Sequence, residues 1–388
     1  MDRICLSVAI VPIAQEFGWS AGLQGIVQSA FLYGYMATQL LGGTLADRFG
    51  GKAVMACGVA WFSLASLLLP VALSAPVERA GLTVAAVLLA RACVGLGEGV
   101  ALPTMNHLVA AHVPPASRAT ALGTAFSGFH CGNLLGLALS PVLMAALGWR
   151  SLFLIFGAVG APLLALWLAV VPARATRVEA ATSARSSTLD LLGSSATWAI
   201  IVVNIVNHWG YFIYLSWMPS YFHQALHLDI KSSSFLAFLP WTVMAVGSSA
   251  AGLLADWLVR RGVPVTDVRK RIQTVAFLGP AAALLVLANR TISPALAVTC
   301  LTMALGTTSL GQAGFVANIS DIAPRYAGQM FGLCNTFGTL AGIVGVSAVG
   351  FIVERTGSFD PVFKLTALLY VLGTVVWNIG CVGTKVFE

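Results

Sequence analysis

GTLADRFGGK at residues 43–52 and GLLADWLVRR at residues 252–261 share the pattern GxLAD followed by basic residues. Each stretch ends a long apolar run, and the two occupy corresponding places in the two halves of the chain. One match would be weak evidence, but two at matching positions indicate an internal repeat. The glycine permits close approach of a second helix, and the aspartate can cap a helix or pair with a basic side chain. The repeat therefore predicts two structurally related halves.

Apolar runs surround both copies of the repeat. Hydrophobic residues make up 58% of the 388 residues, charged residues only 9%, and the mean hydropathy is +0.88. Helices that face lipid need this composition, whereas a soluble core does not. Twelve apolar runs lie near residues 4–14, 22–45, 53–75, 82–112, 119–147, 151–171, 197–222, 233–256, 272–289, 294–320, 327–353 and 361–383. We predict an all-α membrane protein with twelve transmembrane helices in two six-helix bundles.

The two bundles are predicted at residues 1–172 and 197–388. Between them, residues 173–196 are mostly small and polar and cannot bury enough apolar surface to fold, so they are predicted to form a flexible cytoplasmic linker. Counting back from the end of the first run places Arg3 near the middle of the membrane. We therefore expect the first helix to be truncated, and an upstream transit or signal segment would not be visible.

The charge pattern predicts topology and does not favour nucleic-acid binding. The formal net charge is +7, but the basic residues lie singly or in short groups between apolar runs, without a basic face. With both termini in the cytoplasm, thirteen Lys and Arg lie inside and six outside, as the positive-inside rule requires. The seven cysteines form no CxxC pair and indicate neither a disulfide framework nor a metal site, and no cofactor is predicted.

Three ionisable side chains fall at membrane depth: Arg3, Arg91 and Glu98. Each costs about 2.5 to 3.5 kcal/mol there unless it faces a water-filled cavity or a partner of opposite charge. We therefore expect the three side chains to bind an ion. Arg3 would present a planar guanidinium group, whose paired N–H donors suit two oxygens of a carboxylate or phosphate. The alternative is that Arg3 is an ordinary juxtamembrane residue.

Arg91 and Glu98 are seven residues apart, so they share a helix face about 10 Å apart along the axis and cannot pair directly. Gly95, Gly97 and Gly99 would let a neighbouring helix or a ligand approach Glu98 closely. Glu98 could carry a proton or, when ionised, transiently bind Na⁺. The alternative is an interhelical ion pair. Arg91 could steer anions into the protein or act as a gate partner.

The chain resembles the major facilitator superfamily, whose signature loop matches residues 43–52. More narrowly, the blocks at residues 2–19, 90–108, 216–222, 239–256 and 319–342 look like the anion:cation symporter family, which includes plastid phosphate transporters, sialin and vesicular glutamate transporters. The resemblance implies that Arg3 and Ser7 belong to the anion site. It also implies that Asp2 takes part in coupling, although a local salt bridge to Arg3 is an equal alternative. A chloroplast envelope or thylakoid membrane, with stromal termini, is the implied location.

The seventh run offers further substrate contacts. Asn204, Asn207, His208 and Tyr211 fall within two turns and can supply neutral hydrogen bonds and one titratable ring. The resemblance to glutamate transporters, which carry arginine at the place of Asn207 and histidine at that of Gln28, implies a smaller anion here. His130 and Asn335 are also candidates for lining the site, with helix-packing hydrogen bonds as the alternative.

Charged residues at the cytoplasmic rim are predicted to gate the transport path in pairs that form in one state and part in the other. The predicted gating residues are Asp47, Arg48, Arg118, Asp256, Asp321 and Arg325. Surface ion pairs without a role in gating are the alternative.

These features together predict a secondary active transporter that couples Na⁺ or H⁺ to the symport of inorganic phosphate or a similar small anion. A proton-coupled organic-anion symporter is the first alternative, and an uncoupled anion channel or a transport-derived sensor is the second. No HExxH, GxSxG or His-Asp cluster suggests an enzyme. The expected partners are the anion, the coupling cation and membrane lipid, and the protein is expected to work as a monomer.

Overall fold

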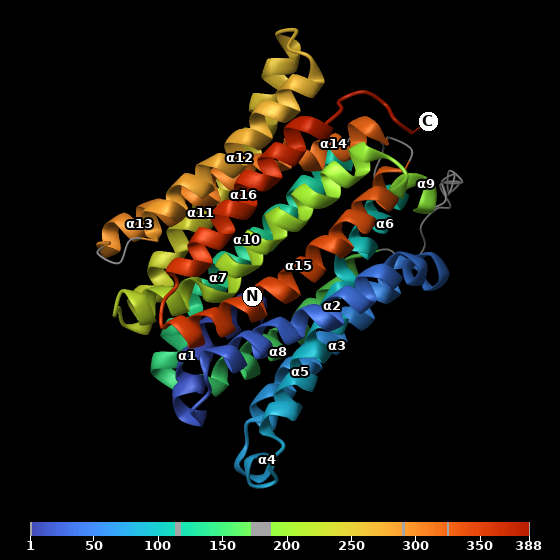
Figure 1. The fold of residues 1–388 in the computed structure, drawn as a ribbon. Coiled ribbons are helices and arrows are strands. Elements are labelled where there is room, and N and C mark those ends of the chain that lie inside the picture. Colours follow the sequence, from blue (N-terminus) through green and yellow to red (C-terminus); the bar gives the residue numbers. More distant parts are fainter. Residues whose placement is uncertain (1, 113–117, 172–187, 289–291, 324–325, 388) are drawn as a thin grey trace. The chain divides into compact units, whose positions relative to one another are not determined.

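The computed structural model describes residues 2–112, 118–171, 188–288, 292–323 and 326–387 (Figure 1). The regular structure in these ranges is entirely helical. The predicted all-α class is therefore confirmed.

The chain divides into two compact units, Met1–Ala181 with Val346–Phe351, and Thr182–Gly345 with Ile352–Glu388. The helices of the first unit are α1 (Asp2–Phe17), α2 (Ala21–Phe49), α3 (Gly51–Ala72), α4 (Ala75–Arg79), α5 (Thr83–Gly99), α6 (Ala101–His112), α7 (Arg118–Leu147) and α8 (Arg150–Val170). The second unit begins with α9 (Thr188–Leu192), α10 (Ser195–Ala225), α11 (Ile230–Arg260) and α12 (Val265–Leu287). It continues with α13 (Pro294–Thr308), the 3₁₀ turn η2 (Ser309–Gln312), α14 (Phe315–Ile322), α15 (Ala327–Thr356) and α16 (Asp360–Gly380). Residues 346–351 of α15 belong to the first unit.

Every predicted span corresponds to one helix or to consecutive helices. Nine stretches of the described chain are long and apolar enough to cross a membrane. They are Gly51–Ala72, Thr83–Val109, Arg150–Val170, Ser195–Ala225, Phe235–Arg260, Val265–Leu287, Pro294–Ile322, Gln329–Thr356 and Asp360–Gly380. The remaining predicted spans coincide with α1, α2 and α7.

Two of the predicted spans are interrupted. The run at residues 82–112 breaks at Val100 into α5 and α6, because Pro103 has no N–H and its ring crowds the carbonyl of Gly99. The run at 294–320 breaks around η2, where Gly314 adopts φ −82° and ψ −101°, outside the helical region. Both interruptions fall inside stretches that still qualify as single spans.

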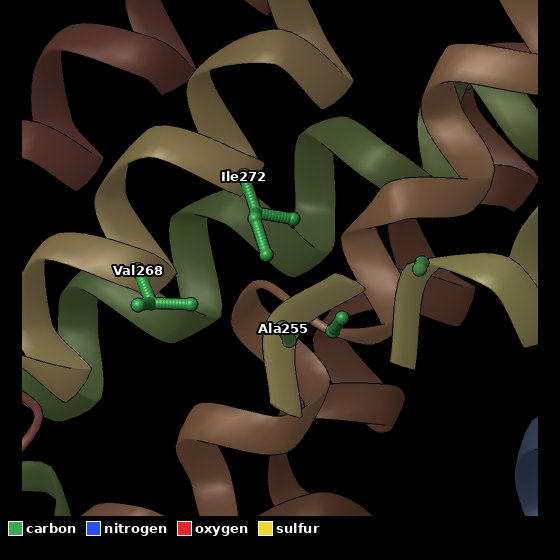
Figure 2. Close-up of a cluster of buried hydrophobic side chains, with 5 residues drawn as sticks. Ala255, Val268 and Ile272 are labelled. Atoms are coloured by element: carbon green, nitrogen blue, oxygen red, sulfur yellow. The ribbon is translucent and has the colours of Figure 1, made fainter. Parts of the chain in front are cut away.

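Both copies of the repeat end at a helix boundary closed by glycine. Gly50 follows α2 with φ +85°, and Gly262 follows α11 with φ +86°. A positive φ strains any residue with a Cβ, so glycine permits these tight turns. In the second copy, Ala255 packs with Val268 and Ile272 of α12 in a buried apolar cluster (Figure 2).

Within the first unit, α5 packs against both α2 and α3, α3 packs against α8, and α1 packs against α7. Within the second unit, α12 packs against α13 and α16, and α10 packs against α16. The end of the predicted linker includes α9, whose Leu191 is fully buried, while residues 173–187 lie outside the described residues.

The chain after α16 is held against α12 and α14. The Ile322 carbonyl accepts hydrogen bonds from the backbone N–H groups of Val386 and Phe387, at 2.9 and 3.0 Å. The Asn318 side chain donates to the Val382 carbonyl at 2.8 Å, and the Gly383 N–H donates to the Thr266 hydroxyl at 2.9 Å. These bonds tie the final residues to the ends of two helices.

Candidate functional site

An ion pair joins the first helix of the chain to α5. The Nε of Arg3 lies 2.5 Å from Oε2 of Glu98, and the two side chains are only 12% and 16% exposed. The pair connects residues that are 95 positions apart in the sequence. Each ion thereby offsets much of the desolvation penalty of the other, which a lone charge at this depth would carry in full.

Three aromatic rings surround the Arg3 guanidinium. Its Cζ lies 4.8 Å from the ring centroid of Phe31, 4.3 Å from that of Tyr35 and 5.5 Å from that of Phe129. Phe31 and Tyr35 are one turn apart on α2 and stack on each other at 5.6 Å. Aromatic faces attract a cation without neutralising it, so they can hold the guanidinium and leave its charge available to an anion.

Arg91 approaches the same cluster from α5. It is 4% exposed, and its Cζ lies 5.3 Å from the centroid of the Phe31 ring. The sequence spacing excludes a direct pair between Arg91 and Glu98, but the Phe31 ring brings Arg91 close to Arg3. Arg3, Arg91 and Glu98 together carry a formal excess of one positive charge.

Close helix packing places Glu98 in this environment. A Cβ added at Gly95 would lie 2.8 Å from the Tyr35 backbone nitrogen, and one added at Gly97 would lie 2.6 Å from the Phe62 backbone nitrogen. Gly95 therefore permits contact with α2 and Gly97 permits contact with α3. Gly99, on the other side of Glu98, likewise faces α2, since a Cβ there would clash with the Tyr35 carbonyl oxygen, so these glycines allow neighbouring helices to approach Glu98.

The other predicted residues of the first unit lie on α1, α2 and α7. Ser7 is buried in α1, and its hydroxyl donates to the Ile4 carbonyl of the same helix at 2.7 Å. Gln28 is buried on α2, and its Nε2 has no hydrogen-bond partner among the described residues. Asp2 and His130 lie in α1 and α7, but their side chains are outside the described part of the structure.

The predicted polar residues of the second unit lie on α10 and α15. A ring nitrogen of His208 lies 3.0 Å from the Asn204 carbonyl, and the Asn335 side chain is within hydrogen-bonding reach of the same ring. Tyr211 packs edge-on against Trp241 at 5.4 Å, and Asn207 is half-buried. These side chains form a neutral, hydrogen-bonding group with one titratable ring.

At the predicted gate, the structure pairs Asp321 with a residue that the sequence did not single out. The Asp321 carboxylate accepts two bonds from Arg269 of α12, at 2.7 and 3.3 Å, and Arg269 also donates to the Ala313 carbonyl at 2.8 Å. The pair lies 52 positions apart in sequence, so no local pattern indicates it.

The remaining gating residues are only partly described. Arg48 is exposed, with its guanidinium 5.3 Å from the Phe49 ring centroid, and Asp256 is exposed at the end of α11. Asp47 and Arg118 lie in α2 and α7, with side chains outside the described part, and Arg325 lies outside the described residues.

A helical fold in two units, with nine apolar stretches among the described residues long enough to cross a membrane and a buried pair of arginine and carboxylate, is typical of a polytopic transporter of small solutes. The model of the Major Facilitator Superfamily matches residues 1–346, and the chain belongs to that family. Its relatives are transporters and not enzymes.

Plant proteins with chloroplastic names are similar over the whole chain. A probable anion transporter 4 of Oryza sativa subsp. japonica is 42% identical over 100% of this chain and 67% of its own length. The ascorbate transporter and the sodium-dependent phosphate transport protein 1 of Arabidopsis thaliana are 40% and 41% identical, over 73% and 77% of their lengths. These relatives confirm the resemblance to plastid anion transporters.

Solved structures share the fold at low sequence identity. A D-xylose-proton symporter matches 99% of this chain and 95% of its own with a TM-score of 0.82 and 16% identity. A bacterial homologue of the human lysosomal transporter Spinster, in an inward-facing and occupied conformation, matches 98% of this chain and 93% of its own. Its TM-score is 0.76 and its sequence identity is 16%. These matches confirm the major facilitator fold.

Proposed function

We propose that this chain is a secondary active transporter of a plastid membrane that couples Na⁺ or H⁺ to the symport of inorganic phosphate or a similarly small oxyanion. The family and the names of the relatives support an anion as the substrate. The observation that carries the proposal is the buried pair of Arg3 and Glu98 beside a second buried arginine, Arg91. A region with two guanidinium groups and one carboxylate attracts an anion.

Arg3 is the proposed anion anchor. Its guanidinium presents several N–H donors in one plane and suits two oxygens of a phosphate or carboxylate. In the structure the Arg3 Nε already donates to Glu98, so the substrate must compete with this carboxylate or share Arg3 with it. Anion binding and the charge state of Glu98 are therefore linked.

Glu98 is the proposed coupling group. A proton that neutralises Glu98, or a sodium ion that binds its carboxylate, weakens the ion pair between Glu98 and Arg3. Binding of the anion to Arg3 is then favoured. Alternating access of the two halves would then carry anion and cation together. The rim residues, including the pair of Asp321 and Arg269, are proposed to gate this movement.

An organic anion is the second candidate substrate. The relative named as an ascorbate transporter is 40% identical to this chain, nearly as similar as the one named for phosphate. The neutral group around His208 offers hydrogen bonds that a hydroxylated organic anion can use. This candidate leaves the proposed roles of Arg3 and Glu98 unchanged.

Uptake of labelled phosphate into proteoliposomes tests the proposal. Sodium and pH gradients are imposed separately, and organic anions are added as competitors. We expect accumulation above equilibrium under one of the two gradients. An anion flux that never exceeds equilibrium under either gradient would indicate a channel and overturn the proposal. Stronger competition by ascorbate than by unlabelled phosphate would assign the site to the organic anion.

A further inference from the structure

We propose that Phe31 is a positioning residue that holds the guanidinium groups of Arg3 and Arg91 around one aromatic ring, so that both can engage the same anion. The inference rests on the proposed function, because it assigns Arg3 and Arg91 to anion binding. Phe31 itself belongs to no recognisable motif, and its ring has no group that could bind the anion directly.

The contacts with the ring define this arrangement. The Arg3 Cζ lies 4.8 Å from the Phe31 centroid and the Arg91 Cζ lies 5.3 Å from it. Because both distances are measured to one point, the two guanidinium carbons are at most about 10 Å apart. Arg3 comes from α1 and Arg91 from α5, so a residue of a third helix links them.

Phe31 is fixed in place by its surroundings. It is 3% exposed and stacks on Tyr35 with an angle of 27° between the rings. Its backbone carbonyl lies directly against Gly95 of α5, where a Cβ would have no room. The tight contact between α2 and α5 therefore sets the position of the ring relative to Arg91.

The chemistry of the ring explains why an aromatic residue is needed. Two like charges in a poorly solvated region repel each other, and the Glu98 carboxylate forms its ion pair with Arg3. An aromatic face carries negative charge density and attracts a guanidinium above it. When Glu98 is neutralised during transport, the rings remain to keep the guanidinium groups ordered. An aliphatic residue of similar volume would fill the space but would lack this attraction.

Graded fluorination of Phe31 tests the inference. Replacing Phe31 with mono-, di- and trifluorinated phenylalanine removes charge density from the ring face with little change in its shape. We expect the KM for labelled phosphate to rise with each fluorine, by about 5- to 30-fold over the series, while the maximal rate changes much less. Where ascorbate is the better competitor, labelled ascorbate replaces phosphate.

The same series at Phe156, a buried phenylalanine of α8, is the matched control and should leave KM unchanged. A flat KM across the Phe31 series, with Arg3→Lys still raising KM, would overturn the role of Phe31 and leave the proposed function intact. If Arg3→Lys also left KM unchanged, the proposed anion site itself would be wrong.

Discussion

Arg3 touches a carboxylate and three aromatic rings, so its variants must be chosen to change one interaction at a time. Arg3→Lys keeps the positive charge and its attraction to Glu98 and the rings, but it loses the planar fork. We predict a rise of about 10- to 100-fold in the KM for the anion, because one charge-assisted hydrogen bond is lost. Initial rates of uptake at a series of anion concentrations measure this change.

Arg79→Lys is the control, since Arg79 lies exposed on the short helix α4 and is outside the proposed site. The two variants should differ clearly in KM. An Arg3→Lys protein with the affinity of the wild type would exclude Arg3 as the anchor.

For single residues, the sequence predicts which ones are unusual but not which side chains contact one another. Arg3, Arg91 and Glu98 stand out because charges at membrane depth are expensive. The pairing of Arg3 with Glu98 depends on where the tertiary fold places α1 relative to α5, which no local pattern records. Phe31 and Tyr35 could not be singled out, because aromatic residues are ordinary in apolar helices.

At the scale of helices, the contact of α5 with α3 depends on Gly97. A Cβ there would lie 2.6 Å from the backbone nitrogen of Phe62 and 2.9 Å from the Gly58 carbonyl, and backbone atoms cannot move aside easily. We predict that Gly97→Ala lowers the free energy of unfolding by about 1–3 kcal/mol. Thermal unfolding of the purified protein, followed by tryptophan fluorescence, measures this loss.

Gly128→Ala on α7 is the matched control, since a Cβ at Gly128 meets nothing within 4 Å. It should be neutral or slightly stabilising, because alanine favours a helix over glycine. Equal stability of the two variants would contradict the close packing at Gly97.

The pair of Asp321 and Arg269 joins α14 to α12. We predict a coupling free energy of about 1–3 kcal/mol in a double-mutant cycle with Asp321→Asn and Arg269→Gln, because the pair is mostly buried and doubly hydrogen-bonded. Unfolding of the four proteins under the same conditions measures it.

Glu16 and Arg150 provide the comparison, since their 2.7 Å ion pair is 41% and 48% exposed. The same cycle at this pair should give about 1 kcal/mol or less, because solvent screens it. A larger coupling at the exposed pair would contradict the structural importance of Asp321.

Helix positions were largely predictable, but hydropathy alone did not reveal the breaks within two of the predicted spans. Hydropathy continues through Val100 and through η2, so a pattern based on apolar residues predicts single helices there. The breaks come from Pro103 and from the backbone at Gly314. Both interrupt the hydrogen bonds of the helix backbone without lowering the hydropathy of the stretch. The pairing of Asp321 with Arg269 was missed because it depends on tertiary packing.

At the scale of the whole molecule, the distribution of basic residues predicts the orientation in the membrane. A membrane-impermeant maleimide can test it on single-cysteine variants, after all seven native cysteines are replaced. Arg260→Cys and Lys385→Cys should be labelled from the same side of the membrane, and Arg79→Cys and Arg355→Cys from the opposite side. Labelling of all four from one side would contradict the predicted topology.

Glu98 is proposed to couple the driving cation to the anion held by Arg3. Glu98→Gln keeps the shape of the side chain but can neither ionise nor exchange a proton. The most direct measurement compares two modes of transport in proteoliposomes: accumulation of labelled anion driven by a cation gradient, and exchange of labelled for unlabelled anion without a gradient. We predict that Glu98→Gln abolishes accumulation and retains exchange, while full gradient-driven accumulation by this variant would exclude Glu98 as the coupling group.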